Sequence, residues 1–314
     1  MPRVAILDDY AGMALDLADW SPVQTRCEVT VFDRHLSEPE AAEALRPFDV
    51  ICTLRERIAL PRTLIERLPN LKLLVTTGMR NAAFDMTALA ERGVVVCGTE
   101  GGGLDTAELT WGLILGAARR IAEDHREMRE GLWQTRIGHR IAGKTLGLLG
   151  LGRLGTAVAR VGLAFDMKVI AWSQNLTAER AAAIGVEYVA KEVLLRRSDI
   201  LSVHLVLSQR SRGLIGRDDI ALMKSGAILV NTSRGPIVDT EAVIKALEAG
   251  RLGYAAFDVY DREPLAANHP LRRAPNLLLT PHVGYVTEEN YRSAYPQIVE
   301  NIAAYLDGRP MRVI

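Results

Sequence analysis

The sequence predicts an α/β protein, with a doubly wound parallel sheet and a second, smaller α/β domain. Three observations support this fold class. The chain has 314 residues, more than the roughly 250–300 that one hydrophobic core usually serves. Short apolar runs alternate with helical patterns in two separate series along the chain. A glycine-rich turn opens the second series, at residues 150 to 155.

The first series lies in residues 3 to 98 and predicts a small flavodoxin-like α/β domain. Its expected strands are Val4 to Leu7, Val29 to Phe32, Val50 to Cys52, Leu71 to Thr76 and Val94 to Cys97, with helices at Pro39 to Leu45, Pro61 to Leu68 and Thr87 to Arg92. Strands that alternate with helices form parallel sheets covered on both faces. This part has no glycine-rich phosphate loop, so we do not expect it to hold a nucleotide.

A long apolar helix follows, from about Asp105 to Ala122, and a second series of strands begins after Lys144. A helix that is apolar on nearly all sides must be buried, either between domains or against a second subunit. The expected strands of the second series are Leu146 to Leu149, Lys168 to Trp172, Val186 to Val189, Ile200 to His204, Ala227 to Asn231, Tyr254 to Phe257 and Leu277 to Thr280. A final helix is expected at about Glu288 to Leu306.

The glycine-rich turn predicts a dinucleotide site in a Rossmann sheet. Gly150, Gly152 and Gly155 follow a short apolar strand and precede a helical pattern. In this arrangement the first glycine permits the tight turn, the second leaves room for a pyrophosphate, and the third lets the helix pack on the strand. The phosphates would then bind the free N–H groups at the start of the helix.

Composition excludes several classes of function. Lysine plus arginine equals aspartate plus glutamate, at 38 each, so there is no basic excess to attract a nucleic acid. The three cysteines are scattered in apolar runs, which indicates buried free thiols in a reducing compartment rather than a disulfide framework or a zinc site. No apolar run approaches the ~20 residues that span a bilayer, and the acidic residues soon after the N-terminus do not fit a signal peptide. We therefore expect a cytoplasmic protein.

Three charged residues follow neighbouring strands at the edge where such sheets bind their ligands. They are Arg234, Glu263 and His282. An arginine grips a carboxylate with two parallel hydrogen bonds, and a histidine exchanges a proton near neutral pH. A carboxylate beside the imidazole favours its charged form and sets its tautomer. This set suits hydride transfer to or from a carbon next to a carboxylate, with His282 as acid/base, Glu263 as its partner and Arg234 as anchor.

Four motifs, in this order, resemble those of the D-isomer specific 2-hydroxyacid dehydrogenases. They are Gly150-Leu151-Gly152-Arg153-Leu154-Gly155, Asn231-Thr232-Ser233-Arg234-Gly235, Phe257-Asp258-Val259-Tyr260-Asp261-Arg262-Glu263-Pro264 and Thr280-Pro281-His282-Val283-Gly284. The resemblance implies a discontinuous substrate domain, residues 1–100 with the helix of residues 286–314, and an inserted nucleotide domain, residues 101–285. It also implies a homodimer formed through the nucleotide domain, and the same catalytic set.

The resemblance further implies a nicotinamide cofactor and several residues near it. Besides the three glycines these are Thr106, Arg153, Leu154, Ser173, His204, Thr232, Asp258 and Gly284. Relatives specific for NAD usually carry an aspartate at the end of the second strand, where this chain has Ser173. Without that carboxylate the 2′-phosphate of NADP is not repelled, so NADP can also bind. However, the next residues are Gln174 and Asn175, and neither is an arginine that would attract the phosphate. The choice between NAD and NADP stays open at this point.

The substrate loop also departs from its relatives. It reads Thr77-Gly78-Met79-Arg80-Asn81-Ala82-Ala83-Phe84-Asp85. We hypothesise that Gly78 and Arg80 or Asn81 face the substrate, and that Arg55 also lines the pocket. The leading prediction is a D-2-hydroxyacid dehydrogenase or 2-oxoacid reductase. The alternatives are a nucleotide-sensing protein that resembles the C-terminal-binding corepressors, and another Rossmann enzyme such as a methyltransferase.

Overall fold

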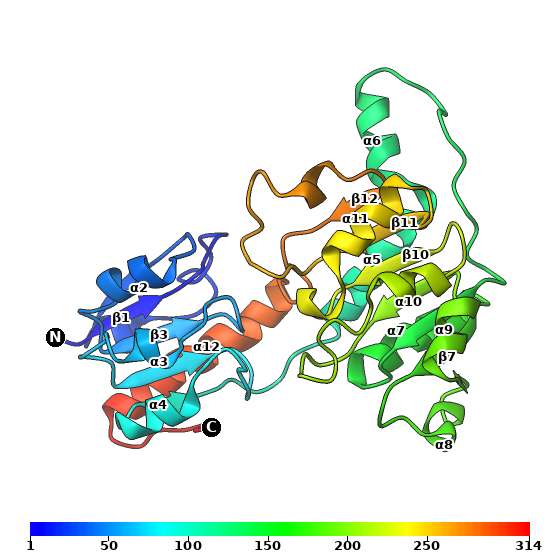
Figure 1. Cartoon of the computed structure of the whole chain (residues 1–314). Coiled ribbons are helices and arrows are strands. Elements are labelled where there is room, and N and C mark those ends of the chain that lie inside the picture. Colours follow the sequence, from blue (N-terminus) through cyan, green and yellow to red (C-terminus); the bar gives the residue numbers. More distant parts are fainter. The chain divides into compact units, whose positions relative to one another are not determined.

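A computed structural model describes all 314 residues and divides the chain into two compact units (Figure 1). The first unit consists of Met1–Gly103 and Val286–Ile314, and the second is Leu104–Tyr285. No helix in either unit combines the length and apolar character that a membrane span requires.

The first unit is built on a parallel five-stranded sheet. Its strands are β1 (Arg3–Ile6), β2 (Glu28–Val31), β3 (Val50–Thr53), β4 (Leu73–Thr76) and β5 (Val95–Cys97), and their order is β2-β1-β3-β4-β5. Its helices are α1 (Ser21–Gln24), α2 (Glu38–Ala44), α3 (Arg62–Ile65), α4 (Met86–Glu91) and α12 (Glu288–Leu306). This order is the flavodoxin-like one. Every residue of β3 and β4 is buried, because helices cover both faces of the sheet.

The end of the chain completes the first unit. Helix α12 packs against β4 and α1, and the segment after it pairs with β5, where the N–H of Ile314 donates to the carbonyl of Val96 at 3.0 Å. The side chain of Asn301 is fully buried. Its amide donates to the carbonyl of Gly98 at 2.8 Å and accepts from Arg312 at 3.0 Å. Distant parts of the sequence therefore share one core.

The second unit is a parallel seven-stranded sheet in the order β12-β11-β10-β9-β6-β7-β8. The strands are β6 (Thr145–Leu149), β7 (Lys168–Trp172), β8 (Glu187–Tyr188), β9 (Ile200–Val203), β10 (Ile228–Asn231), β11 (Tyr254–Phe257) and β12 (Leu277–Leu279). The helices are α5 (Asp105–Arg119), α6 (Ile121–Arg129), α7 (Arg153–Ala164), α8 (Ala178–Ala182), α9 (Lys191–Arg197), α10 (Arg217–Leu222) and α11 (Thr240–Glu248), with 3-10 turns at η1 (Gly235–Ile237) and η2 (Pro270–Arg273).

Two apolar cores, one on each face, hold the second sheet. One core contains residues of α5 and α7, and the other contains residues of α9, α10 and α11. This is the doubly wound arrangement, and the order of strands reverses between β6 and β9. In such sheets the ligands bind beyond the carboxyl ends of the strands, at the point of reversal. Both predicted sheets are therefore present.

Two predicted helices were too long. The helix expected at Pro61 to Leu68 spans only Arg62–Ile65. The apolar helix expected to reach Ala122 ends at Arg119, and α6 begins at Ile121. Between them Arg120 adopts a left-handed backbone, with φ of 58°. Its guanidinium lies over the ring of Tyr254 and donates to Asn276 at 2.7 Å. Tertiary contacts thus break the helix at a residue that carries no turn signal.

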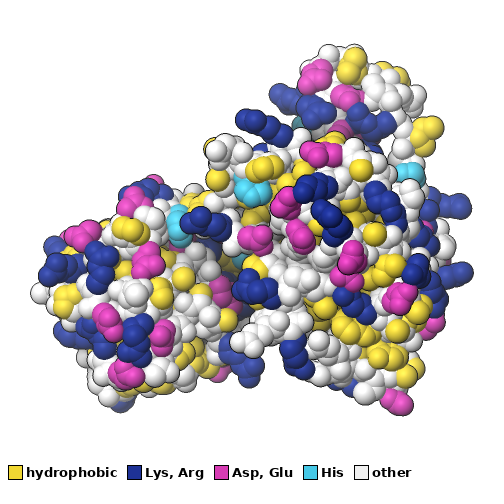
Figure 2. Space-filling view, viewed as in Figure 1, with side chains coloured by type: hydrophobic (Ala, Val, Ile, Leu, Met, Phe, Trp, Pro, Cys, Tyr) yellow, Lys and Arg dark blue, Asp and Glu magenta, His cyan; other side chains and the backbone are white.

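Charges of both signs are spread over the surface. On the face that Figure 2 shows, lysine and arginine side chains alternate with aspartate and glutamate side chains on both units. This pattern agrees with the balanced composition of 38 basic and 38 acidic residues.

Candidate active site

The three charged residues predicted from the sequence lie beyond the carboxyl ends of neighbouring strands. Arg234 follows β10, Glu263 follows β11 and His282 follows β12, and these strands are adjacent in the sheet. All three therefore belong to one edge of the second unit.

Glu263 and His282 form a direct pair. The Nδ1 atom of His282 lies 2.5 Å from Oε2 of Glu263, and both side chains are largely buried, with 15% and 23% exposed. The other carboxylate oxygen, Oε1, accepts a hydrogen bond from the backbone N–H of Tyr260 at 2.8 Å. Because Glu263 engages Nδ1, the Nε2 atom of the ring is left to exchange a proton. The ring of Tyr285 packs edge-on against the imidazole at 5.6 Å.

The segment of Arg234 packs directly on the segment that leads to Glu263. A Cβ atom at Gly235 would collide with the backbone of Tyr260 and Asp261, so only glycine permits this approach. The amide of Asn231 donates to the carbonyl of Arg234 at 3.0 Å. Backbone packing thus sets where the segment of Arg234 lies, and the guanidinium of Arg234 donates to the carbonyl of Ser233 at 2.7 Å.

Asp258 stabilises the turn that contains His282. Its Oδ1 atom accepts from the hydroxyl of Thr280 at 2.6 Å and from the N–H of Val283 at 2.8 Å, and Oδ2 accepts from the N–H of Gly284 at 2.9 Å. The side chain is 1% exposed, and this burial raises the pKa of Asp258 above its usual value. The resemblance implies that Asp258 lies near the cofactor, and in the structure its carboxylate also binds the chain itself.

Two threonines near the expected cofactor are also bonded within the unit. The hydroxyl of Thr106, at the start of α5, donates to the carbonyl of Gly284 at 3.0 Å. The hydroxyls of Thr110 and Thr232 lie 2.8 Å apart. These bonds join α5 to the segments that follow β10 and β12.

The glycine-rich turn has the geometry that a pyrophosphate needs. Gly150 has φ of +102°, which side chains rarely allow. A Cβ atom at Gly155 would collide with the carbonyl of Gly150, whereas one at Gly152 would meet nothing within 4 Å. Gly152 precedes Arg153 and Leu154, the first residues of α7, and no side chain caps this helix. The open space at an uncapped helix N-terminus fits the phosphates of a dinucleotide.

Ser173, which the resemblance places near the cofactor, directly follows β7. Gln174 and Asn175 beside it are exposed. The guanidinium of Arg180 reaches only the carbonyl of Asn175, at 3.5 Å. No carboxylate is present here to repel a 2′-phosphate.

His204 lies behind the glycine-rich turn. Its Nε2 atom is 2.9 Å from the hydroxyl of Ser202, and its carbonyl is the group that a Cβ atom at Gly150 would strike. Burial lowers the pKa of His204 to about 4, so this imidazole is neutral at physiological pH.

The residues expected to face the substrate belong to the first unit. Gly78 has φ of +89°, and the guanidinium of Arg55 occupies the space where its Cβ would lie. Asn81 is buried, and its amide donates to the carbonyl of Arg55 at 2.8 Å and to the hydroxyl of Thr76 at 3.0 Å. Arg80 is exposed, and no hydrogen bond or ion pair occupies its guanidinium. Asn81 therefore shapes the loop, while Arg80 is available to a ligand.

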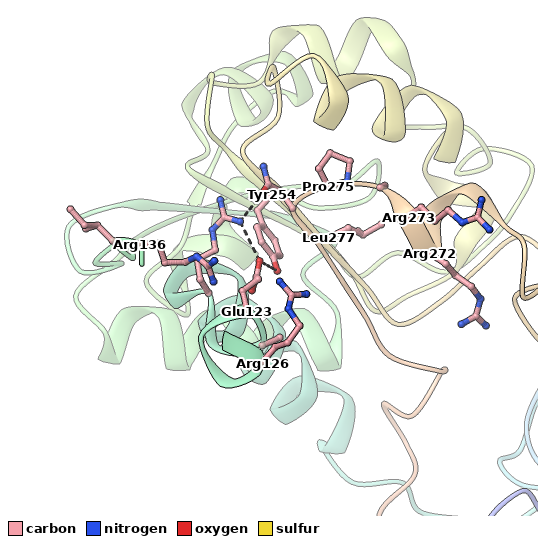
Figure 3. Close-up of a pocket in the computed structure, with 13 residues that line it drawn as sticks. Glu123, Arg126, Arg136, Tyr254, Arg272, Arg273, Pro275 and Leu277 are labelled. Atoms are coloured by element: carbon pink, nitrogen blue, oxygen red, sulfur yellow. Dashed lines mark hydrogen bonds and ion pairs between the residues drawn. The ribbon is translucent and has the colours of Figure 1, made fainter. Parts of the chain in front are cut away.

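A separate cavity of about 670 Å³ lies at the amino ends of β11 and β12, where each strand begins. Figure 3 shows Tyr254 at its wall, next to Glu123 and Arg126 of α6. The hydroxyl of Tyr254 donates to Glu123 at 2.9 Å. Since the dyad and the glycine-rich turn lie at the carboxyl ends, this cavity is not part of the candidate active site.

Sequence reasoning did not find the roles of Tyr260 and Ser202. Tyr260 stands inside a quoted motif, but a tyrosine after a strand carries no signal that its backbone and hydroxyl bind two other segments. Ser202 could have been noticed, because alternate residues of a strand share one face and residue 204 was already a candidate.

Comparison with known proteins identifies the family of the chain. Residues 111–284 match the family model of the D-isomer specific 2-hydroxyacid dehydrogenase, NAD binding domain. The glyoxylate reductase of Aeropyrum pernix is 38% identical over 98% of this chain and 94% of its own length. A D-3-phosphoglycerate dehydrogenase of Archaeoglobus fulgidus is 35% identical over 88% of this chain, but this match spans only 53% of that protein.

A solved structure shows the same fold over the whole chain. It is that of a putative D-3-phosphoglycerate dehydrogenase oxidoreductase from Ralstonia solanacearum, with a TM-score of 0.93 and 35% identity, covering 100% of this chain and 96% of that one. Nothing in the comparisons favours a corepressor-like sensor. The chain belongs to the D-isomer specific 2-hydroxyacid dehydrogenases, and it is an oxidoreductase that interconverts a 2-hydroxyacid and its 2-oxoacid with a nicotinamide cofactor.

Proposed function

We propose that Arg234, Glu263 and His282 form the catalytic set for this reaction. The observation that carries the proposal is the 2.5 Å contact between His282 Nδ1 and Glu263 Oε2 at the carboxyl edge of the sheet. A carboxylate in this position stabilises positive charge on the imidazole and leaves Nε2 to give a proton. Arg234 offers a permanently charged fork for the substrate carboxylate.

In the reductive direction the two electrons arrive as a hydride, which the nicotinamide supplies when bound. His282 would give the proton from Nε2 to the carbonyl oxygen of the 2-oxoacid as the carbonyl carbon is reduced. The product is the 2-hydroxyacid, and His282 regains a proton from solvent. Glu263 keeps the ring oriented throughout, and Arg234 holds the carboxylate next to the reacting carbon.

We propose that the second unit binds the cofactor and the first unit binds the substrate. The glycine-rich turn and the open position at Gly152 support the first assignment. The unoccupied guanidinium of Arg80, in a loop after β4, supports the second. Arg80 would bind the carboxylate or the distal group of the substrate.

We further propose that the enzyme accepts both NADH and NADPH. Ser173 carries no charge, so neither a 2′-hydroxyl nor a 2′-phosphate is repelled at the end of β7. The same position offers no arginine to select the phosphate.

Glyoxylate is the first candidate substrate, because the Aeropyrum pernix relative is named a glyoxylate reductase. The test is oxidation of NADH and of NADPH, followed at 340 nm, with glyoxylate, hydroxypyruvate, pyruvate and phenylpyruvate. We expect turnover with both cofactors and a D-configured product from pyruvate. Tight binding of a reduced cofactor with no turnover on any 2-oxoacid would instead favour the sensor.

We also propose a homodimer located in the cytoplasm. Helix α6 has no buried residue, and five apolar side chains on it and on the segment after it are about half or more exposed, at positions Ile121, Met128, Leu132, Trp133 and Ile137. Such a patch is typical of a surface that a second copy covers. The three cysteines are buried and free, which supports a reducing compartment.

A further inference from the structure

Tyr260 contacts both segments that build the candidate dyad. It lies between β11 and Glu263, and it is 8% exposed. Its backbone N–H donates to Oε1 of Glu263 at 2.8 Å. Its hydroxyl lies 2.8 Å from the carbonyl of Thr280 and 3.2 Å from that of Phe257. A phenol has one hydrogen to donate. The shorter of the two contacts is to Thr280, which lies in the turn of His282, so we assign the hydrogen bond to that carbonyl.

The carbonyl of Thr280 is the group on which the backbone of His282 depends. The N–H of His282 donates to this same oxygen at 3.1 Å, two residues back along the chain. His282 has φ of +54°, a conformation that residues other than glycine seldom adopt and that persists only where the surroundings enforce it. The hydroxyl of Tyr260 therefore holds the acceptor around which His282 turns.

Asp258 holds the other side of the turn. It binds the hydroxyl of Thr280 before His282 and the N–H groups of Val283 and Gly284 after it. With the hydroxyl of Tyr260, four hydrogen bonds from the segment after β11 secure the turn. The same short segment thus supplies Glu263 and the supports of its partner.

We propose that Tyr260 is a positioning residue for the His282–Glu263 pair, acting on Glu263 through its N–H and on His282 through its hydroxyl. The inference rests on the proposed function of that pair. In this role Tyr260 contacts neither the substrate nor the cofactor. The hydroxyl sets the distance between imidazole and carboxylate, and so it tunes proton donation.

The test uses Tyr260→Phe, which removes one oxygen atom and keeps the ring and the backbone N–H. Tyr254→Phe is the matched control. Tyr254 is also buried, at 3% exposed, and its hydroxyl donates to Glu123 at the opposite end of β11. Both substitutions remove one buried phenol hydrogen bond from the same unit. The measurements are the rate of NADH oxidation in a single turnover with glyoxylate across pH, the Kd for NADH, and Tm.

A misplacement of 1 Å costs up to about 100-fold in rate, so we expect Tyr260→Phe to slow the single turnover about tenfold. The pH profile of the rate should differ from that of wild type, because the imidazole and the carboxylate are no longer held in their 2.5 Å contact. Glu263 and Asp258 are the charged groups that face the ring. The Kd for NADH should stay within twofold of wild type. Tyr254→Phe should lower Tm to a similar degree and leave the rate and the pH profile unchanged.

Two results would overturn the inference. The first is a wild-type rate and pH profile in Tyr260→Phe, and the second is an equal change in both variants. His282→Asn separates these results from failure of the proposed function. If His282→Asn is inactive while Tyr260→Phe matches wild type, only the role of Tyr260 is wrong. If His282→Asn keeps full activity, the proposed catalytic set itself is wrong.

Discussion

Two histidines of the second unit, His204 and His282, illustrate how surroundings decide the use of one residue type. His282 contacts the carboxylate of Glu263, which stabilises a positive charge on the ring. His204 contacts the hydroxyl of Ser202, and burial lowers its pKa to about 4. The ring of His282 therefore keeps its Nε2 atom for proton exchange, whereas the neutral ring of His204 bonds to Ser202 and its backbone carbonyl packs on the glycine-rich turn.

The low pKa of His204 predicts a loss of stability in acid. Its usual value is 6.5, so between pH 6.5 and 4 the unfolded chain binds a proton that the folded chain does not. The stabilisation is complete above this window and is lost as pH falls. Since one pKa unit corresponds to about 1.4 kcal/mol, the loss at pH 5 is about 2 kcal/mol. Urea titrations at pH 7 and pH 5 should show a smaller difference in His204→Gln than in wild type; equal differences would refute this.

Arg80 is predicted to contribute to substrate binding. A hydrogen bond to a charged group is worth about 1.5–3 kcal/mol, so Arg80→Ala should lower kcat/KM about 10- to 100-fold for every 2-oxoacid that the enzyme accepts. Arg46, another exposed arginine of the first unit, provides the control, and Arg46→Ala should behave as wild type. Unchanged kinetics in Arg80→Ala would remove this residue from the substrate site.

In the turn between β6 and α7, one glycine is needed for folding and another for binding. Gly155 is required by the chain itself, because a Cβ there collides with the carbonyl of Gly150. Gly152 has an ordinary backbone and open space around its Cβ position. Gly155 is therefore needed for packing of the helix on the strand, whereas Gly152 is needed only to leave room for a ligand.

This difference predicts opposite effects of two similar substitutions. Gly155→Ala should cost about 1–3 kcal/mol or more of stability, as overpacking does, and should lower Tm. Gly152→Ala should keep the wild-type Tm but weaken NADH binding at least tenfold, because its methyl group occupies the space of the pyrophosphate. Calorimetry and a fluorescence titration with NADH would measure both effects. Tight NADH binding by Gly152→Ala would exclude the glycine-rich turn as the phosphate site.

Periodicity predicted the elements well where burial alone determines them. The expected and observed bounds coincide for β7, β11 and α12, and the apolar runs located every other strand within a few residues. The break at Arg120 was missed, because it depends on Tyr254 and Asn276, far away in sequence. Likewise the motif identified Asp258 but not the direction of its carboxylate, which the turn after β12 determines.

At the scale of the whole molecule, the proposed homodimer depends on the exposed apolar patch of α6 and the segment after it. Trp133 and Ile137 are 74% and 92% exposed. Each large apolar side chain contributes about 1.5–3 kcal/mol when it is fully buried. The double variant Trp133→Ser with Ile137→Ser should therefore weaken the dimer at least 100-fold.

Sedimentation equilibrium measures this directly. Val206 is 86% exposed and lies outside the patch, so Val206→Ser should leave the dimer intact. A wild-type protein that sediments as a monomer would contradict the proposal, as would a double variant that dimerises normally.

The most direct test of the account is the catalysis of His282→Asn, measured together with its affinity for NADH. Asparagine keeps a polar side chain but cannot give a proton near neutral pH. Since general acid catalysis typically contributes about 10²- to 10⁴-fold, we predict that kcat for glyoxylate reduction falls at least 100-fold while the Kd for NADH stays within a few-fold of wild type. Wild-type turnover by His282→Asn would show that the residues beyond β10, β11 and β12 do not perform the reaction.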